Sequence, residues 1–508
     1  MPLQKNQVLT LRVERLSSDG SGVAHSPDGE TVFIPGAAPG DEARVRIVKD
    51  CKRYAFGILD EVLTPSPDRI PVDCAVAGPC GGCSLRHLDY AAELRAKQEN
   101  VADAFARIGG LDVPVLPIVG SPEVNRYRNK VQFPVGVDKS GKPCIGFYAG
   151  RTHRIVPCPD CRLQPGVLNE IGNALCAFFA EKGIQPYSEE TGRGLVRHIF
   201  LRRGAHSGQI MVCLVCTRAK LPSAEELCTR LKAQFAEITT ILLNVNAKNT
   251  NVILGTETHT LYGQGYIEDT LCGVPVQLGP LSFYQVNTLA AEQLYGIAAQ
   301  YAQLTPDDLL LDLYCGMGTI GLSMAAHCRE LIGVEIVPEA IESAKANAAR
   351  MGADVAAKSR FFCADAGQAA TRLAAEGLHP DIVMLDPPRK GCDEATLSAV
   401  VRMSPRRVVY VSCNPATAAR DAAWLEQNGY HAEKVQPVDL FPRTRHCEAV
   451  LLLTKLHVER HIEVDVSMDE LDVTAAESKA TYNEIRDYVW EHHQLKVSNL
   501  YIAQVKQK

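Results

Sequence analysis

The pattern of apolar and polar residues changes character three times along the chain. Residues 1–63 contain short runs in which apolar and polar residues alternate, separated by turns such as "SSDGSG" and "GAAPGD". Short strands at this spacing are typical of a small β-barrel of OB type. We therefore predict an OB-like barrel over residues 1–63, followed by a linker that begins with "TPSPDRIP" at residues 64–71.

Residues 64–280 mix helical and strand-like patterns. A helical pattern fits residues 91–108, and strand-like runs include residues 130–137 and 209–215. We expect a central α+β domain over residues 64–280.

Residues 281–456 follow a different rhythm, because short apolar runs alternate with helical patterns. This rhythm predicts a doubly wound α/β sheet. Its predicted strands are residues 309–314, 330–335, 361–364, 381–385, 407–411 and 449–453. Residues 457–508 begin with an acidic stretch, which predicts a flexible linker, and continue with apolar residues at helical spacing, which predict a helix at about 480–492.

Length and composition indicate a soluble protein of several domains. The 508 residues exceed what one core supports, and 46% apolar with 22% charged residues is ordinary for a globular protein. No apolar run approaches the ~18 residues of a membrane span, and the N-terminus lacks the apolar segment of a signal peptide. We expect a cytoplasmic monomer that does not contact membranes. Its 18 cysteines should then be free thiols, metal ligands or catalysts.

The net charge of −6 does not indicate nucleic-acid binding, but two local clusters of bases are interleaved with Tyr, Phe or His. Either cluster alone is typical of a solvated surface, whereas the two together could contact RNA. They consist of Arg126, Arg128 and Lys130 in "NRYRNK", and of Arg193, Arg197, Arg202 and Arg203 in "RGLVRHIFLRR".

A glycine turn predicts a nucleotide-binding site. "LLLDLYCGMGTIGLSMA" is a strand, a turn and a helix, with Gly316, Gly318 and Gly321 in a G-x-G-x-x-G pattern. Glycines let the backbone approach a ligand closely. Glu335, at the end of the next predicted strand, could bind both ribose hydroxyls of an adenosine. These features fit NAD and S-adenosylmethionine (SAM) equally well.

Three later strands each carry a reactive side chain at one end. Asp386 ends one in "DIVMLDPPRKGCD", Cys413 ends the next in "VYVSCNPAT", and Glu448 precedes the last in "FPRTRHCEAVLLL". Ligands of such sheets bind outside the carboxyl ends of the strands. A dehydrogenase has no need for Asp-Pro-Pro there, so these residues favour SAM. A buried packing role is the ordinary reading of a cysteine, but the place of Cys413 between a strand end and Asn-Pro favours catalysis.

A cluster of cysteines predicts a metal centre. "DCAVAGPCGGCSLRHLDY" contains Cys74, Cys80 and Cys83, and "VPCPDCRLQ" offers Cys158 or Cys161 as a fourth ligand. Four thiolates suit zinc, and they also suit an iron–sulfur cluster. Spacing alone does not decide between these metals.

Five motifs in order make the chain similar to the RNA uracil-C5 methyltransferases: "SFYQVN", "DLYCGMGT", "LDPPRKG", "VSCNP" and "PRTRHCE". The resemblance covers about residues 1–456. It implies that Cys413 is the nucleophile and Glu448 the general base, with Asp365 a weaker candidate for the cofactor site. It also implies that SAM contacts Gln285, Tyr314, Glu335 and Asp386.

The resemblance carries further implications for the N-terminal half. The barrel resembles a TRAM domain, an RNA-binding module, and the cysteine pattern resembles that of family members with a structural [4Fe–4S] cluster. A barrel and a cluster together imply 23S rRNA as the substrate, because the tRNA branch usually lacks both. Two alternatives stay open: a tRNA uracil-C5 methyltransferase, and an RNA-binding or chaperone-like protein without catalysis. The implied cluster ligands are Cys74, Cys80, Cys83 and Cys161.

Overall fold

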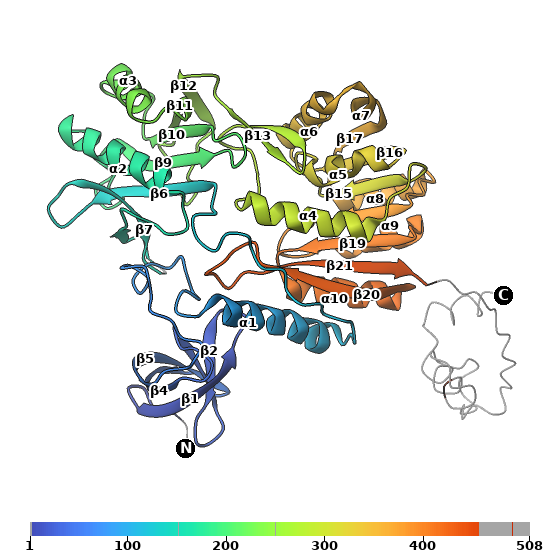
Figure 1. Cartoon of the computed structure of the whole chain (residues 1–508), viewed down its shortest axis with the longest axis horizontal. Helices are drawn as coiled ribbons and strands as arrows, with labels where there is room; N and C mark the ends of the chain where they lie inside the picture. The colour runs from blue at the N-terminus through green and yellow to red at the C-terminus, as the bar shows by residue number, and fades with distance from the viewer. Residues whose placement is uncertain (1–2, 151, 249, 457–489, 491–508) are drawn as a thin grey trace, which may run out of the picture.

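Five short strands at the N-terminus close into a barrel, in the order β1-β2-β3-β5-β4. Pairing of β1 with β4 completes the ring. Alternate residues point inward, and they include the fully buried Val32, Val45 and Ile47. The strands are β1 (Val8–Leu16), β2 (Ser21–His25), β3 (Thr31–Pro35), β4 (Glu42–Asp50) and β5 (Tyr54–Thr64). The computed structural model describes residues 3–150, 152–248, 250–456 and Trp490, and it confirms the predicted barrel (Figure 1).

The predicted linker is tied to the barrel at Asp41, whose side chain is fully buried. The Asp41 carboxylate accepts hydrogen bonds from the backbone N–H groups of Ala38 and Ser66 and from the Arg69 guanidinium. Buried carboxylates require such partners, so this anchor holds the start of the linker against the barrel.

Helix α1 (Tyr90–Asp103) continues into a π-helical turn, η1 (Ala104–Gly109), as the pattern at 91–108 predicts. Asp89 caps its N-terminus by accepting from the Ala92 N–H at 2.7 Å. The helix lies between the barrel and the C-terminal sheet (Figure 1).

The central sheet has the order β12-β11-β10-β9-β6-β7-β8 and is antiparallel except for the β10–β11 pair. All seven residues of β10 are buried, because both faces of this strand are covered. Helices α2 (Gly166–Glu181) and α3 (Ala224–Gln234) pack on one face. The strands are β6 (Lys130–Val137), β7 (Pro143–Tyr148), β8 (Ile155–Pro157), β9 (Val196–Arg203), β10 (Ile210–Cys216), β11 (Ile238–Val245) and β12 (Glu257–Tyr262).

A hairpin, β13 (Ile267–Leu271) and β14 (Val274–Leu278), leads into the C-terminal sheet, whose order is β17-β16-β15-β18-β19-β21-β20. Strands β15 to β19 are parallel, and β21 lies antiparallel between β19 and β20. The sheet strands are β15 (Leu309–Leu313), β16 (Glu330–Glu335), β17 (Ser359–Cys363), β18 (Ile382–Leu385), β19 (Arg407–Ser412), β20 (Tyr430–Val438) and β21 (Glu448–Lys455).

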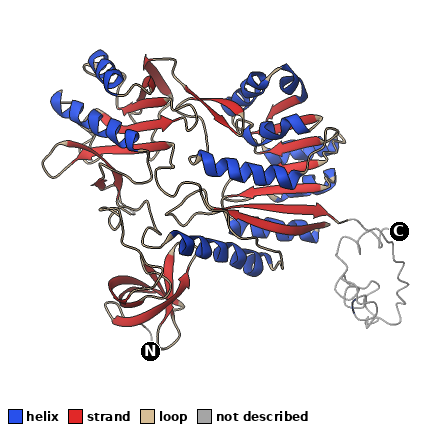
Figure 2. Cartoon of the chain, viewed as in Figure 1, coloured by secondary structure: helices blue, strands red, loops and turns tan. Residues whose placement is uncertain are grey.

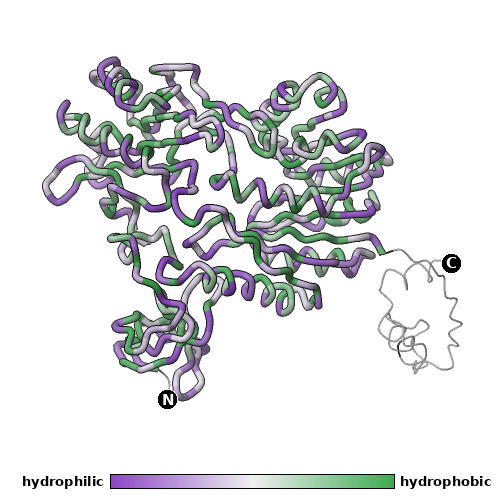
Figure 3. Tube along the Cα trace, viewed as in Figure 1, coloured by the Kyte–Doolittle hydropathy of each residue, from purple (hydrophilic) through white to green (hydrophobic). Residues whose placement is uncertain are grey.

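Helices cover both faces of this sheet, which confirms the predicted doubly wound α/β fold (Figure 2). Alternation along the strands explains the two layers: Leu310 and Met384 pack towards α4, whereas Leu311 and Val383 pack towards α9 and α10. Hydrophobic residues accordingly concentrate along the strands (Figure 3). The helices are α4 (Thr288–Ala302), α5 (Thr319–Met324), η2 (Ala325–His327), α6 (Pro338–Met351), α7 (Ala353–Lys358), α8 (Ala366–Ala375), α9 (Glu394–Met403) and α10 (Pro415–Gln427).

Two groups of sequence predictions are not settled by these elements. Strand β5 ends at Thr64 and β14 ends at Leu278, but the exact domain boundaries stay predictions. The acidic linker and the helix predicted within residues 457–508 lie outside the described residues, apart from Trp490. None of the described helices has the length and apolar character that crossing a bilayer requires.

We expect Phe133→Ala to destabilise the protein by about 3–5 kcal/mol, because a buried aromatic ring is lost and a cavity remains. Phe133 lies on β6, is fully buried and packs against Phe147. Thermal or urea unfolding measures the loss. Val137→Ala on the same strand is the control, because Val137 is 56% exposed. Equal losses in the two variants would contradict the assignment of Phe133 to the core.

Candidate functional site

Parallel pairing brings the ends of three strands to one edge of the C-terminal sheet. Leu385 of β18 lies between Leu313 of β15 and Tyr410 of β19, so Asp386 emerges in the middle of this edge. This is the edge where ligands of doubly wound sheets bind.

The antiparallel strand β21 adds a second carboxylate to this edge. Ser412 of β19 is paired with Ala449 of β21, so the next residues, Cys413 and Glu448, face each other across the two strands. Directly opposite residues of an antiparallel pair have Cβ atoms about 5 Å apart. The structure therefore brings together the three side chains that the sequence placed at separate strand ends.

A tight turn holds Cys413 between β19 and α10. The Ser412 hydroxyl accepts from the Asn414 N–H at 3.0 Å and donates to the Asn414 carbonyl. The Asn414 side chain caps α10 by accepting from the Ala416 N–H, and its amide donates to the Arg389 carbonyl at 2.9 Å. The loop after Asp386 and the nucleophile turn are thus bound to each other.

Burial dominates the electrostatics of the site. It raises the pKa of Glu448 to about 8, with a further rise from the charge of Asp386 and an opposing effect of Arg389. Burial also raises the pKa of Asp386 to about 7. The pKa of the Cys413 thiol is raised to about 11 by burial, then by Glu448 and Asp386, again against Arg389. These mutual effects show that the four groups share one electrostatic environment.

The glycine turn has the geometry that the motif predicts. Gly316 and Gly318 have φ of +56° and +79°, a region that other residues rarely adopt. The Gly316 N–H donates to Glu335 at 3.2 Å, and the Val337 N–H donates to the same carboxylate at 2.9 Å. Glu335 therefore lies beside the turn, at the end of the neighbouring strand.

Asp312 is a buried acid that sequence reasoning missed. One of its carboxylate oxygens accepts from the Gly321 N–H at 3.0 Å, and the other has no hydrogen-bond partner among the described residues. Burial raises its pKa to about 8 despite the Gly321 bond, with added effects of Asp386 and Glu335. A Cβ at Gly321 would approach the Asp312 carboxylate to 2.8 Å, so this position requires glycine. The available signal was a single acid within the apolar strand "LLLDL".

Gln285 precedes helix α4, and its backbone carbonyl accepts from the Asn129 side chain at 2.8 Å. Its side chain interacts with Tyr295, whose hydroxyl lies 3.4 Å from the Thr319 hydroxyl at the start of α5. The charge of Asp386 also contributes to raising the pKa of Tyr295. This links Gln285 to the edge that carries Asp386.

The two remaining cofactor candidates have partners of their own. The Tyr314 hydroxyl lies 3.3 Å from that of Thr396 on α9, and Tyr314 has a φ of +65°. The Asp365 side chain caps α8 by accepting from the Gln368 N–H at 3.1 Å. Asp365 therefore has a local structural role.

Comparison with known proteins agrees with this geometry. A family model described as tRNA (uracil-5-)-methyltransferase matches residues 205–456, and a TRAM domain model matches residues 2–59. A relative from Halalkalibacterium halodurans, named as an uncharacterised RNA methyltransferase, is 43% identical over 453 residues, which are 89% of this chain and 98% of the relative. A relative of the same description from Oceanobacillus iheyensis is 41% identical over 455 residues, 89% of this chain and 98% of its own.

The chain belongs to the RNA uracil-5 methyltransferase family. A solved structure supports the assignment: the Pyrococcus abyssi tRNA (uracil-54, C5)-methyltransferase, in complex with S-adenosyl-L-homocysteine, resembles this enzyme with a TM-score of 0.70 and 27% identity, over 88% of this chain and 100% of that chain. The family resemblance, the TRAM barrel and the methyltransferase fold predicted from the sequence are thereby confirmed.

Several cysteines of the methyltransferase's central region lie close enough to affect one another's pKa values. Cys80 and Cys83 each interact electrostatically with Cys161, and Cys80 also with Cys74. A hydrogen bond from Cys158 lowers the pKa of Cys161 to about 6. Within the described ranges, no group of three or more His, Cys, Asp or Glu side chains is arranged to hold a metal ion.

The two basic clusters do not form one solvated face of the methyltransferase. Arg202 is buried and donates to the carbonyls of Gly279 and Ser282, and Arg197 is buried and donates to backbone carbonyls of the loop after β11. Arg126 is paired with Asp160. These three arginines stabilise the chain instead. Arg128 donates to the Lys130 carbonyl at 3.2 Å, and Arg389 is the cation that affects Cys413 and Glu448.

We expect the stability of the enzyme to depend on the protonation of Glu448. Its pKa is about 8 in the folded protein against an ordinary 4.5, so between these values the folded state binds the proton more tightly. Stability therefore falls as pH rises from about 5 to 8, by at most about 1.4 kcal/mol per pH unit for this group. Glu448→Gln should remove this component, so the variant gains stability over the wild type as pH rises.

Unfolding curves at several pH values measure the difference. Glu394→Gln on α9 is the control, because Glu394 is exposed and its loss should leave the pH dependence unchanged. Parallel pH profiles for the wild type and Glu448→Gln would contradict the raised pKa.

Proposed function

We propose that this enzyme transfers the methyl group of SAM to carbon 5 of a uridine in RNA through a covalent bond between Cys413 and the base. The observation that carries the proposal is the meeting of Cys413, Glu448 and Asp386 at one edge of the sheet, beside the glycine turn. A thiol and a carboxylate at one place are what this reaction requires.

Carbon 5 of uracil is a poor nucleophile until a thiolate adds to carbon 6. The Cys413 sulfur would form a bond to carbon 6, and the resulting enolate would attack from carbon 5. SAM supplies an electrophilic methyl group, which carbon 5 takes as the sulfonium becomes a neutral thioether. Glu448 would then remove the proton of carbon 5, and the enolate so formed would expel the Cys413 thiolate.

The raised pKa values of the site fit a cationic ligand. In the free protein, burial keeps Glu448 and Cys413 protonated at neutral pH, and Asp386 is close to half ionised. A positive sulfonium beside Asp386 would favour ionised carboxylates, because an opposite charge within about 4–6 Å stabilises the charged form. Arg389 would likewise favour the Cys413 thiolate. Binding of SAM would thus prepare the site for catalysis.

We assign the SAM site to the carboxyl ends of β15, β16 and β18. Glu335 would bind the ribose hydroxyls, as acids at this place do in related sheets. Asp386, Gln285 and Tyr314 would contact the remainder of the cofactor, in keeping with the family resemblance. Asp312 accepts from the Gly321 N–H of the glycine turn, and its other carboxylate oxygen has no hydrogen-bond partner among the described residues.

We also propose that Cys74, Cys80, Cys83 and Cys161 hold a [4Fe–4S] cluster, which would be structural because methyl transfer needs no electron. The four thiols are near enough to affect one another, and Gln164 Nε2 lies 3.9 Å from Cys161 Sγ, as a donor to a ligand sulfur would. Zinc is the alternative for four thiolates. Cys158, which donates to Cys161, would be outside the ligand set.

We propose 23S rRNA as the preferred substrate. The enzyme would act on it as a cytoplasmic monomer, with domain boundaries at about residues 63, 280 and 456. A TRAM barrel and a cysteine cluster support it by family resemblance. tRNA is the second candidate, because the similar Pyrococcus abyssi enzyme acts on tRNA. That likeness covers 88% of this chain and 100% of the other.

We expect the purified enzyme, with SAM and 5-fluorouridine-substituted RNA, to form an adduct that survives a denaturing gel. Fluorine at carbon 5 cannot be removed as a proton, so elimination of Cys413 is blocked. Cys413→Ala should form no adduct and should lose methyl transfer. Cys228→Ala is the matched control, because Cys228 is a partly exposed thiol, like Cys413, but lies on α3 of the central domain and should not matter.

Parallel reactions with 23S rRNA and tRNA transcripts rank the two substrates by adduct yield. An adduct with Cys413→Ala would exclude this residue as the nucleophile. Bound SAM without any adduct or methylation of either RNA would favour the non-catalytic RNA-binding alternative.

We expect anaerobically purified protein to contain about four iron atoms and four acid-labile sulfides per chain. Cys161→Ala should lose most of both, whereas Cys144→Ala, a half-buried thiol on β7, should keep them. Metal and sulfide analysis with the visible absorption spectrum measures this. Zinc without sulfide would replace the iron–sulfur assignment with a zinc site. Protein that contains neither iron nor zinc would contradict the proposed metal centre.

A further inference from the structure

The loop between β20 and β21, residues 439–447, is held in an unusual way. It has no strand partner over residues 440–443, and yet the carbonyl oxygen of each of these four residues accepts a hydrogen bond from a different segment of the chain. The pairs are Asn287 Nδ2 to Leu440 O (3.0 Å), Lys97 Nζ to Phe441 O (3.2 Å), Tyr127 OH to Pro442 O (3.0 Å), and the N–H groups of Ser84 and Leu85 to Arg443 O (3.1 Å each).

These donors come from four separate segments of the chain. Asn287 caps α4, Lys97 lies on α1, Tyr127 belongs to the segment before β6, and Ser84 directly follows Cys83 of the cysteine segment. The donor side chains are 153 to 344 residues distant in sequence from the carbonyls they bind. Local backbone preference therefore does not set the conformation of this loop, which depends on the surrounding segments.

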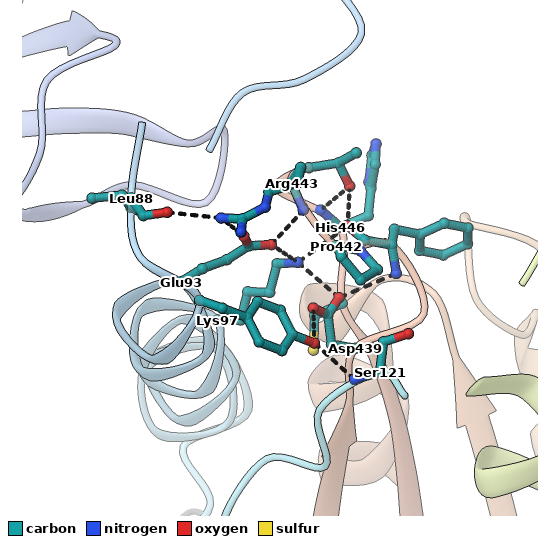
Figure 4. A network of polar contacts seen from close by, with 12 residues as sticks. Leu88, Glu93, Lys97, Ser121, Asp439, Pro442, Arg443 and His446 are labelled. Carbon is teal, nitrogen blue, oxygen red and sulfur yellow. Dashed lines mark hydrogen bonds and ion pairs between the residues drawn. The ribbon is translucent and has the colours of Figure 1, made fainter. Parts of the chain in front are cut away.

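Four charged side chains, three of them buried, lie at the centre of this arrangement (Figure 4). Lys97 Nζ is 2.7 Å from Glu93 Oε1 and 2.8 Å from Asp439 Oδ1, and Arg443 Nη1 is 3.5 Å from Glu93 Oε2. The exposed fractions of the Lys97, Glu93 and Asp439 side chains are 2%, 0% and 0%. Two cations balance two anions, which is the condition for keeping charges inside a protein.

Both carboxylates also bind the backbone of the loop. Glu93 accepts from the Arg443 N–H at 2.7 Å, and Asp439 accepts from the Phe441 N–H at 3.1 Å. The Tyr90 hydroxyl donates to the second oxygen of Asp439 at 3.0 Å. Lys97 therefore contacts both anions that hold the loop, and also a carbonyl of the loop itself.

The loop leads directly to Glu448, the first residue of β21, which is paired with Val438 at the other end of the loop. A displacement of residues 439–443 would therefore displace the Glu448 side chain relative to Cys413. We propose that Lys97 is a positioning residue, which through Asp439, Glu93 and the Phe441 carbonyl holds Glu448 where it can remove the proton of carbon 5. This inference rests on the proposed role of Glu448.

Such a role predicts a specific kinetic defect. Addition of Cys413 and methyl transfer do not require Glu448 as a base, whereas proton removal and release of the enzyme do. Loss of Lys97 should therefore leave RNA binding and adduct formation intact and slow the final elimination. A misplacement of about 1 Å can reduce a rate by about 100-fold.

The test compares Lys97→Met with Lys97→Arg and with the double variant Lys97→Met/Asp439→Asn. The double variant keeps one buried cation and one buried anion, Arg443 and Glu93, and so avoids an unbalanced charge that could prevent folding. Arg95→Met is the matched control, because Arg95 lies on the same helix with 56% of its side chain exposed. The readouts are kcat, KM, and adducts on denaturing gels with ordinary-uridine and 5-fluorouridine RNA.

We expect Lys97→Met and the double variant to show a kcat lowered by about 100-fold and an adduct that accumulates on ordinary-uridine RNA. KM should fall together with kcat, because only a step after adduct formation is slowed. Lys97→Arg should recover part of kcat, and Arg95→Met should behave as the wild type.

Wild-type kcat in folded Lys97→Met would overturn the inference while the proposed function stands. Loss of adduct formation on 5-fluorouridine RNA in both Lys97 variants would also overturn it, because the role would then be structural. Failure of the wild type itself to form that adduct would overturn the proposed function, and this inference with it.

Discussion

The insertion of β21 antiparallel between β19 and β20 is the constraint on which the site depends. Parallel strands alone would deliver Asp386 and Cys413 to this edge of the sheet, because both follow strand ends. An antiparallel neighbour delivers a residue from its start instead, and Glu448 is that residue. A shift of one residue in this register would turn Glu448 to the other face of the sheet. The thiol and the carboxylate therefore meet because of strand direction and register, not because of sequence proximity.

The register in turn requires support for the loop that precedes β21. Residues 439–447 must return from β20 across the edge of the sheet, and their backbone groups must find partners there. Helix α1, the cap of α4, Tyr127 and the cysteine segment supply these partners. The barrel contributes as well, since Arg445 reaches the carbonyl of Asp19. The parts of the protein outside the C-terminal sheet thus converge on the loop next to the site.

Buried charge is a common theme of the molecule and serves two different purposes. In the network around Lys97, cations and anions are balanced and bonded, which stabilises one arrangement of the chain. At the edge of the sheet, Asp312, Asp386 and Glu448 are acids whose pKa values are raised by burial. An excess of buried acids without enough cations is costly, and a cationic ligand would relieve it. The balanced cluster around Lys97 therefore fits a structural role, whereas the excess of acids at the sheet edge fits a ligand-binding site.

The sequence by itself determined the fold class and named the candidate site residues. Strand period, the glycine turn and the residues at strand ends are local properties, so Cys413, Asp386 and Glu448 could be named before their positions were known. Tertiary structure decided what depends on distant partners. Arg197 and Arg202 were grouped with surface cations, but both are buried against backbone carbonyls. Lys97 has no local signal of importance, and Asp312 has only its place within an apolar strand, because a charge inside the protein acquires its role from the groups that folding brings around it.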